Sequence, residues 1–166
     1  VLQGLICLSK LRWPAGLTGK ELDPLARYFL WEHSLDYDHG TGHGVGVFSN
    51  VHQGPQGISR LNTVPLNPGM ILSVEPGVYL EGKLGIRLEN LVYVKKKSGN
   101  SRQKREFLEF ETLTLVPFEK KLIEKDLLSR DELHWLNSYH DNVYKKLSPF
   151  LNVSEKTWLR DACKIL

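Results

Sequence analysis

The stretch that decides the fold runs from His39 to Pro55 and reads His39-Gly-Thr-Gly-His43-Gly-Val-Gly-Val-Phe-Ser-Asn-Val-His52-Gln-Gly-Pro55. Its three histidines invite a catalytic or metal-binding interpretation, because imidazole is the commonest protein metal ligand and titrates nearest neutral pH. His39 and His43 stand four apart, but the glycines between and beyond them argue against a helical zinc motif, since each costs a helix about 1 kcal/mol relative to alanine. We expect a loop or a bulged strand, in which glycine permits positive φ and close backbone approach. Alone, the stretch fits a functional site and a solvated turn equally well.

Two downstream runs each place a carboxylate inside an apolar, strand-like pattern. They read Met70-Ile-Leu-Ser-Val-Glu75-Pro-Gly and Gly85-Ile-Arg87-Leu-Glu89-Asn-Leu-Val-Tyr-Val94. If the second run is one strand, Arg87 and Glu89 share a face. That pair is either a structural ion pair within a sheet or a metal ligand with its electrostatic support. A buried carboxylate requires a cation, a hydrogen-bond network or a metal, and one histidine with two glutamates fits Mn, Co or Zn.

Taken in order, these motifs resemble the C-terminal half of aminopeptidase P, the Xaa-Pro aminopeptidase branch of the pita-bread metallopeptidases. The similarity is clear from about Phe29 to Phe118 and continues, more weakly, through Trp135-Leu-Asn-Ser-Tyr-His140. The resemblance implies an α+β fold. Residues 1–118 would form the C-terminal half of a pita-bread domain, a curved antiparallel sheet with helices on its outer face. Residues 119–166 would form a C-terminal helical extension.

The resemblance also implies a role for each candidate site residue. The matching metal ligands are His43, Glu75 and Glu89, and the matching catalytic residues that do not ligate metal are His39, His52 and Arg87. Family members hold two divalent ions, most often Mn, and Tyr79 receives no role. The family's other two ligands are aspartates in an upstream hairpin, which nothing from Val1 to Tyr37 resembles. Asp23, followed by Pro24, is instead expected to cap a helix that runs to about His33.

Three functions follow from this partial match. The chain is a fragment of a metal-dependent aminopeptidase that removes the residue preceding a proline in second position, and it is inactive alone, with one metal or none. Alternatively, it is a truncated, non-catalytic family member that acts as a binding or scaffold module, or a protein with a single occupied metal site. The chain opens inside an amphipathic helix, as though cut from a longer polypeptide.

Two C-terminal helices are expected, the first capped by Ser129 with Glu132 and the second beginning near Ser154. The first helix carries more apolar and aromatic surface than it can easily bury, which predicts a homodimer interface. The residues concerned are Leu133, Trp135, Leu136, Tyr139, Val143 and Tyr144. His134 and His140, on the same helix, are interpreted as ordinary polar or interface residues.

Composition sets the remaining expectations. A chain of 166 residues, 41% hydrophobic, can bury one substantial core. Much of its +3 net charge falls between Lys95 and Arg105, which is predicted to be a mobile hairpin loop rather than a nucleic-acid contact because no aromatic residues are interleaved. Two cysteines favour a reducing, cytoplasmic location. No signal peptide is apparent, and no apolar run approaches the roughly 20 residues of a membrane span.

Overall fold

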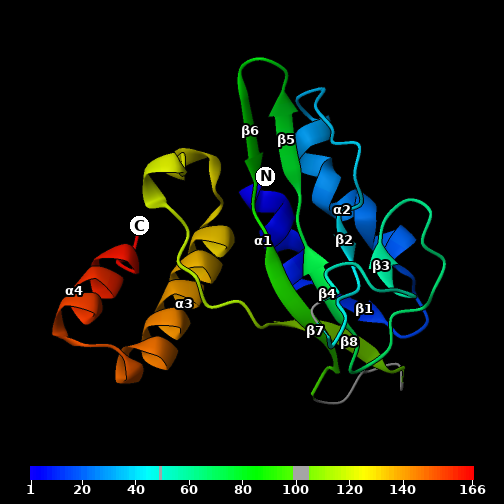
Figure 1. Cartoon of the computed structure of the whole chain (residues 1–166). Helices are drawn as coiled ribbons and strands as arrows, with labels where there is room; N and C mark the ends of the chain where they lie inside the picture. The colour runs from blue at the N-terminus through cyan, green and yellow to red at the C-terminus, as the bar shows by residue number, and fades with distance from the viewer. Residues whose placement is uncertain (49, 99–104) are drawn as a thin grey trace. The chain divides into compact units, whose positions relative to one another are not determined.

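The computed structural model describes residues 1–48, 50–98 and 105–166. These residues form two compact units, Val1–Leu113 and Thr114–Leu166 (Figure 1). No helix in the described part of the chain has the length and apolar character needed to cross a membrane.

A four-stranded antiparallel sheet forms the centre of the first unit. Its strands are β1 (Arg12–Pro14), β8 (Phe107–Thr112), β7 (Asn90–Lys96) and β4 (Ile71–Val74), in that spatial order. Their alternate side chains form one buried face, as the period of two predicts. Fully or almost fully buried on it are Leu72, Val74, Val92, Val94 and Leu108. Three strands are expected to share one antiparallel sheet: one that leads to Glu75, one that follows Glu89 and one that contains Phe110. This prediction is confirmed.

The predicted mobile loop from Lys95 to Arg105 connects β7 to β8. Lys95 and Lys96 belong to β7 and pair with Glu109 and Leu108. Residues 99–104 lie outside the described part of the chain, so the predicted mobility is not tested.

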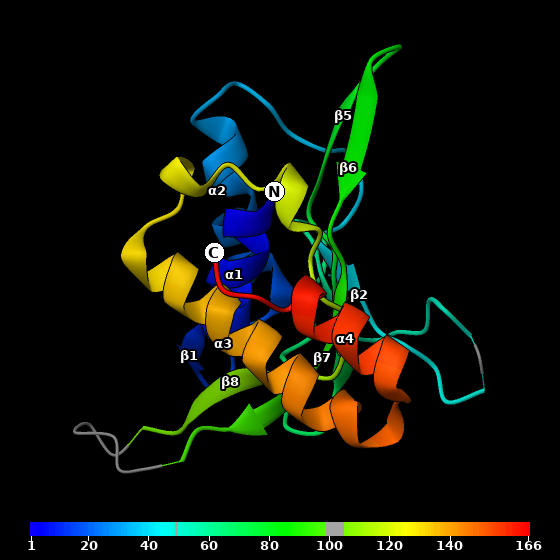
Figure 2. The same ribbon diagram turned by 90° about the vertical axis from the view of Figure 1, so that its left-hand side faces the viewer.

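The run from Gly85 to Val94 is two strands rather than one. β5 (Gly77–Leu80) and β6 (Leu84–Arg87) form a hairpin of their own, which projects beyond the end of the main sheet (Figures 1 and 2). Pro76 has no N–H to donate to a ladder, so β4 ends at Val74 and pairing resumes only at β5. The partner strand breaks at the same level, where Leu88 donates its N–H to the carbonyl of Pro76 at 3.3 Å.

Two helices precede the histidine-rich stretch. α1 (Leu2–Lys10) contacts the sheet at β8 and packs against α2 (Gly19–Trp31), and α2 also contacts β3 (Gly57–Ile58) (Figure 2). Gly4 permits the close helix packing, because a Cβ there would lie 2.3 Å from the carbonyl oxygen of Ala26.

Asp23 does not cap α2, contrary to the expectation from Asp23-Pro24. The cap is Thr18, whose backbone N–H and hydroxyl both donate to the Glu21 carboxylate, at 2.8 and 2.5 Å. This capping box satisfies free N–H groups of the first turn, so the helix begins five residues before Pro24. Asp23 is fully buried and accepts a hydrogen bond from Arg27 Nε at 2.8 Å.

The second unit contains α3 (Arg130–Leu147) and α4 (Val153–Ala162), with three short 3₁₀ helices. These are η1 (Lys120–Leu122), η2 (Lys125–Leu127) and η3 (Ser148–Phe150). The predicted capping box of Ser129 and Glu132 at the start of α3 is present.

A small apolar core holds these helices together. Tyr139, Val143 and Leu159 are its buried members, and Trp135 and Tyr144 pack against them. Four of the six apolar residues of α3 that were expected at a dimer interface therefore contribute to this core: Trp135, Tyr139, Val143 and Tyr144.

His140 is fully buried, which corrects its interpretation as an ordinary polar or interface residue. Its Nε2 accepts a hydrogen bond from the backbone N–H of Phe118 at 3.1 Å, so a neutral ring carries its proton on Nδ1. Nδ1 is buried and finds no hydrogen-bond partner within the described structure. Burial lowers the pKa of His140, and the nearby charge of Lys120 lowers it further.

We predict that acid destabilises the protein through His140. The pKa of His140 is lower in the folded state than in the unfolded chain, so its neutral ring favours folding. This contribution to the free energy of unfolding is complete above the unfolded pKa of about 6.5 and is lost as the pH falls below it. Denaturant unfolding followed by circular dichroism should give a lower midpoint at pH 5.5 than at pH 7.5. His140→Gln should flatten that dependence, whereas His134→Gln, at an exposed position of the same helix, should leave it unchanged. An equally steep dependence in His140→Gln would contradict the assignment.

Candidate metal centre

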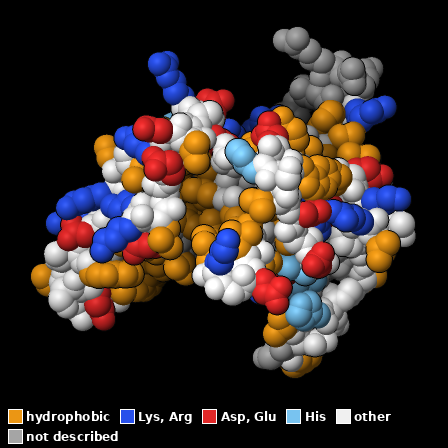
Figure 3. All heavy atoms as spheres, turned by 90° about the horizontal axis from the view of Figure 1, so that it is seen from above, with side chains coloured by type: hydrophobic (Ala, Val, Ile, Leu, Met, Phe, Trp, Pro, Cys, Tyr) orange, Lys and Arg blue, Asp and Glu red, His pale blue; other side chains and the backbone are white. Residues whose placement is uncertain are grey.

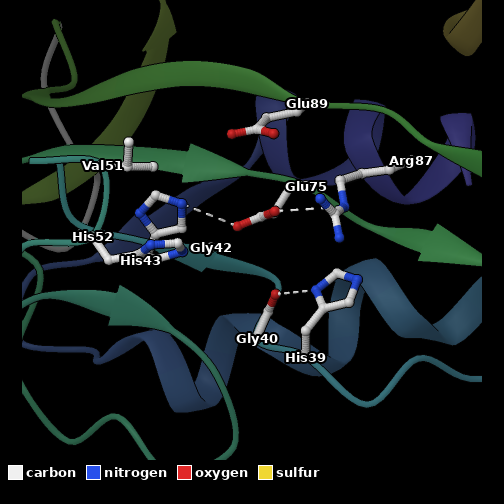
Figure 4. A pocket seen from close by; sticks show the side chains of 9 residues that line it. All are labelled: His39, Gly40, Gly42, His43, Val51, His52, Glu75, Arg87 and Glu89. Atoms are coloured by element: carbon white, nitrogen blue, oxygen red, sulfur yellow. Dashed lines mark hydrogen bonds and ion pairs between the residues drawn. The ribbon is translucent and has the colours of Figure 1, made fainter. Parts of the chain in front are cut away.

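Three short elements of the first unit bring together the side chains expected to ligate metal. His43 ends β2 (Gly42–His43), Glu75 directly follows β4, and Glu89 lies between β6 and β7. One donor atom from each side chain lies within 4.8 Å of the other two (Figure 4). Among the residues that the structure describes, this is the one group of three or more histidine, cysteine or acidic side chains with such spacing.

Close approach of two backbones creates the cluster. A Cβ at Gly42 would lie 2.0 Å from the carbonyl oxygen of Ser73 in β4, and a Cβ at Gly44 would lie 2.1 Å from the carbonyl oxygen of Gln53. Neither glycine has a positive φ. These glycines therefore allow backbone segments to approach one another closely, and the expected positive φ is wrong.

Hydrogen bonds then fix the two ligands relative to each other. The backbone N–H of His43 donates to Ser73 Oγ at 3.0 Å, and Ser73 Oγ donates to Glu75 Oε1 at 3.2 Å. The backbone N–H of Glu75 donates to the carbonyl of Thr41 at 2.7 Å. One serine hydroxyl therefore links the strand that carries the imidazole to the carboxylate that faces it.

The orientation of the His43 ring presents an unshared electron pair to Glu75. Its Nδ1 lies 2.9 Å from the carbonyl oxygen of Gly44, and a carbonyl only accepts, so Nδ1 carries the proton of a neutral ring. Nε2 then has no proton, yet it lies 3.2 Å from Glu75 Oε1. Two acceptors at this distance require either a bridging proton, carried by the ring or by the carboxyl group, or a metal ion. The donor set fits a divalent metal.

A second chain of hydrogen bonds joins two predicted catalytic residues through Tyr79. Arg87 Nε donates to the Tyr79 hydroxyl at 2.9 Å, and that hydroxyl lies 2.8 Å from His39 Nε2. His39 Nδ1 lies 2.8 Å from the carbonyl oxygen of Gly40 and therefore donates to it, which leaves Nε2 as the acceptor (Figure 4). Tyr79 thus donates its single proton to His39.

Tyr79 is a site residue that sequence reasoning missed. In the β5–β6 hairpin it stands opposite Gly85, and Gly77 stands opposite Arg87, so Tyr79 and Arg87 project from the same face two positions apart. Its ring lies over Gly77 and Gly85, because a Cβ at either glycine would meet it within 3.1 Å. The signal was available from reading residues 77–87 as a hairpin that turns at Gly82.

The acidic partner of Arg87 is Glu75. Arg87 Nε lies 3.7 Å from Glu75 Oε2, and no ion pair of Arg87 with Glu89 occurs within the described residues. The structural ion pair considered as an alternative for Arg87 and Glu89 is therefore not formed. Glu89 remains exposed, with its carboxylate directed at the cluster (Figure 4).

His52 completes the group of imidazoles. Its ring centroid lies 3.9 Å from that of His43, at an interplanar angle of 44°. All six residues singled out from the sequence line one open pocket of about 330 Å³, together with Gly40, Gly42 and Val51. The space-filling view from above shows histidine side chains next to acidic ones on the protein surface (Figure 3).

Two of the three aspartates upstream of the histidine-rich stretch, Asp23 and Asp36, have other partners. Asp23 binds Arg27 and Thr41, and Asp36 binds Arg27 and Arg60. Burial would raise the pKa of Asp36, but its hydrogen bonds with Arg27 and the Tyr37 backbone outweigh burial and lower that pKa to about 2. In the part of the chain that is described, neither aspartate joins the metal cluster.

The sequence matches two related families. Residues 1–96 match metallopeptidase family M24, and residues 106–166 match the C-terminal region of peptidase M24. A probable Xaa-Pro aminopeptidase P from Botryotinia fuckeliana is 48% identical over 165 residues, covering 96% of this chain and 25% of the relative. One from Laccaria bicolor is 45% identical over 172 residues, covering 100% of this chain and 27% of the relative. The chain thus spans about a quarter of the length of these relatives.

Solved structures show the same fold. The X-prolyl aminopeptidase from Caenorhabditis elegans, described as a cytosolic enzyme with a di-nuclear active site, superimposes with a TM-score of 0.91 at 41% identity. The match covers 100% of this chain and 28% of that one. An Xaa-Pro dipeptidase from Bacillus anthracis gives a TM-score of 0.56 at 31% identity, covering 72% and 30%. The predicted α+β fold, half of a pita-bread domain with a helical extension, is confirmed by the first of these neighbours.

We predict that Gly42→Ala separates β2 from β4. The added Cβ would overlap a backbone oxygen, which cannot rotate away, so the strands must move apart at a cost of about 1–3 kcal/mol in unfolding free energy. Urea unfolding should show that loss. Gly40→Ala in the same stretch is the matched control, because its nearest contact would be Ser59 Cβ at 3.3 Å. Equal stability of the two variants would show that the close approach at Gly42 is not a constraint.

Proposed function

Because this chain belongs to metallopeptidase family M24, we propose that it is part of a metal-dependent aminopeptidase that removes the N-terminal residue from peptides with proline in second position. The relatives named Xaa-Pro and X-prolyl aminopeptidase support this substrate class. The observation that carries the proposal is the position of His43 Nε2, an unprotonated nitrogen in a neutral ring that faces Glu75 Oε1 at 3.2 Å.

His43, Glu75 and Glu89 offer one imidazole nitrogen and two carboxylates to a divalent ion, and we propose that this ion is Mn. Nitrogen and carboxylate oxygen suit Mn, Co and Zn alike, and the family resemblance favours Mn. When bound, such an ion supplies a Lewis acid for the scissile carbonyl and lowers the pKa of water.

The other pocket residues would act on the substrate. His39 Nε2 is held by the Tyr79 hydroxyl at 2.8 Å, so the position of the ring is fixed before substrate arrives. The Arg87 guanidinium carries its charge 3.7 Å from Glu75 and balances part of the charge of that carboxylate. We propose that the His39 and His52 imidazoles stabilise the negative charge that develops on the substrate during attack.

The described residues supply half of a two-metal centre. A second ion would need further carboxylates, and Asp23 and Asp36 are engaged elsewhere. We propose that the missing aspartate ligands come from the rest of the parent polypeptide, and that the isolated chain binds one ion weakly and does not hydrolyse peptides. We also propose a cytoplasmic location, which the cytosolic relative supports.

We predict weak, specific metal binding by the isolated chain. Calorimetric titration with Mn²⁺ should give one site, and His43→Ala or Glu75→Gln should abolish it because each removes one of only three ligands. Glu81→Gln is the matched control, since it neutralises an exposed carboxylate at the turn of the β5–β6 hairpin. Unchanged Mn²⁺ binding by Glu75→Gln would contradict the assignment of Glu75 as a metal ligand.

The same preparation distinguishes the three functions considered from the sequence. An Arg-Pro-Pro peptide in excess Mn²⁺ should not be cleaved by the chain alone. It should be cleaved when the part of the parent polypeptide that precedes this chain, here called the upstream half, is produced separately and added. Activity of the chain alone, lost in His43→Ala, would contradict the half-site. Metal binding without activity in the mixture would favour a protein with a single metal site, and neither binding nor activity would favour a scaffold module.

We propose in addition that the parent protein is a homodimer that associates through the C-terminal unit. The apolar surface available there lies around α4 rather than on the buried face of α3: Phe150, Val153 and Trp158 are 84, 83 and 65% exposed. Sedimentation velocity should show a dimer that Trp158→Asp shifts toward monomer, with Lys156→Asp as the control for added charge on the same helix. A monomer at high concentration would contradict the proposal.

A further inference from the structure

Arg27 is a buried cation that connects Asp23 of its own helix to the segment that leads to the pocket. Only 2% of its surface is exposed, and its carboxylate partner Asp23 is fully buried. Its Nε donates to Asp23 at 2.8 Å, and one terminal nitrogen donates to Asp36 at 2.7 Å. The two carboxylates hold the planar guanidinium in one orientation.

The remaining donors of Arg27 bind backbone carbonyls just before the first glycine of the pocket. One terminal nitrogen donates to the carbonyl of Tyr37 at 2.6 Å, and the other donates to the carbonyl of His39 at 2.8 Å. The guanidinium also lies 3.9 Å from the centre of the Tyr37 ring. One side chain of α2 thus sets the path of the backbone through residues 37–39.

A line of hydroxyls reinforces this connection. Thr41 Oγ1 donates to Asp23 Oδ1 at 2.5 Å, so the Tyr37 hydroxyl, 2.6 Å from Thr41 Oγ1, is the donor in that contact. Burial raises the pKa of Tyr37 to about 12, which keeps this proton in place. The segment 37–41 is therefore attached to α2 at both of its ends.

His39 depends on this attachment more than His43 does. His43 lies in β2, where it pairs with Gly57 and donates its N–H to Ser73. His39 lies outside every strand, and its backbone carbonyl is held by Arg27. Loss of Arg27 should therefore release the His39 ring while the strand still holds His43.

We propose that Arg27 is a positioning residue for His39: from its buried site between Asp23 and Asp36, it fixes the backbone that directs the His39 imidazole toward Tyr79 and the pocket. Its consequence for catalysis rests on the proposed function. The orientation of the ring itself does not, and it can be measured without any activity.

The test uses nitrogen NMR of the histidine side chains in the 166-residue chain, with Arg27→Lys. Lysine keeps the charge but has a single nitrogen, which cannot bind two carboxylates and two carbonyls at once. The wild type should show His39 protonated on Nδ1 alone, and Arg27→Lys should show a mixture of tautomers for His39, with His43 unchanged and Mn²⁺ affinity within about twofold. With the upstream half added, kcat should fall about 10–100-fold, as for other residues that orient site groups.

Arg60→Gln is the matched control. Arg60 binds the same Asp36 carboxylate from an exposed position but contacts no carbonyl of the segment, so His39 should keep its wild-type signal. If Arg27→Lys does not fold, Asp36→Asn replaces it, because it loosens Arg27 from the partly exposed side and should give the same tautomer mixture for His39. A wild-type His39 signal in the folded variant, or equal disturbance of His39 and His43, would overturn the proposal. Absence of activity in every mixture, with the NMR result as expected, would instead count against the proposed function alone.

Discussion

The close approach of Gly42 to the carbonyl of Ser73 is the constraint on which the site depends. With 2.0 Å between that oxygen and a would-be Cβ, glycine is the residue that lets β2 lie against β4. The approach brings the His43 N–H to the Ser73 hydroxyl and thus the imidazole to Glu75. The position of His43 relative to Glu75 is therefore determined by the packing of two backbone segments against each other.

Charge in the pocket is arranged around a position that requires a cation. Glu75 is 9% exposed, too little for water alone to solvate its carboxylate. The neighbours that could compensate it are the Ser73 hydroxyl, Arg87 at 3.7 Å and His43, whose nearer nitrogen carries no proton in a neutral ring. The compensation is incomplete, and a divalent ion between His43 and the two glutamates would complete it.

Sequence periodicity predicted the sheet because alternation of apolar side chains determines which face each strand buries, and the family resemblance implied that His43, Glu75 and Glu89 come together. Periodicity failed where a long-range contact decided the outcome. The strand through Arg87 and Glu89 divides because its partner is interrupted at Pro76, which alternation within the run itself does not reveal. Tyr79 was missed for the same reason, since its importance depends on the residues opposite it.

Two local sequence patterns competed as the predicted start of α2. Asp23-Pro24 suggested a helix start, yet Thr18-Gly-Lys-Glu21 upstream is a capping box, and Asp23 serves a buried ion pair instead. His140 was placed correctly on its helix, but its burial depends on the packing of Phe118 from a segment more than twenty residues away, as does its hydrogen bond. The local sequence pattern therefore predicted which segments are helices, but not where α2 begins or that His140 is buried.

The division between the main sheet and the β5–β6 hairpin has a consequence for how such a site can change. Glu75 follows β4 of the main sheet and His43 lies in β2, which packs against β4, whereas Tyr79 and Arg87 are carried by a two-stranded arm that projects from the sheet (Figure 1). Substitutions along the arm can reshape the wall of the pocket that carries Arg87 while the wall that carries His43 and Glu75 keeps its geometry. The two walls belong to separate structural elements, so one can change while the other is retained.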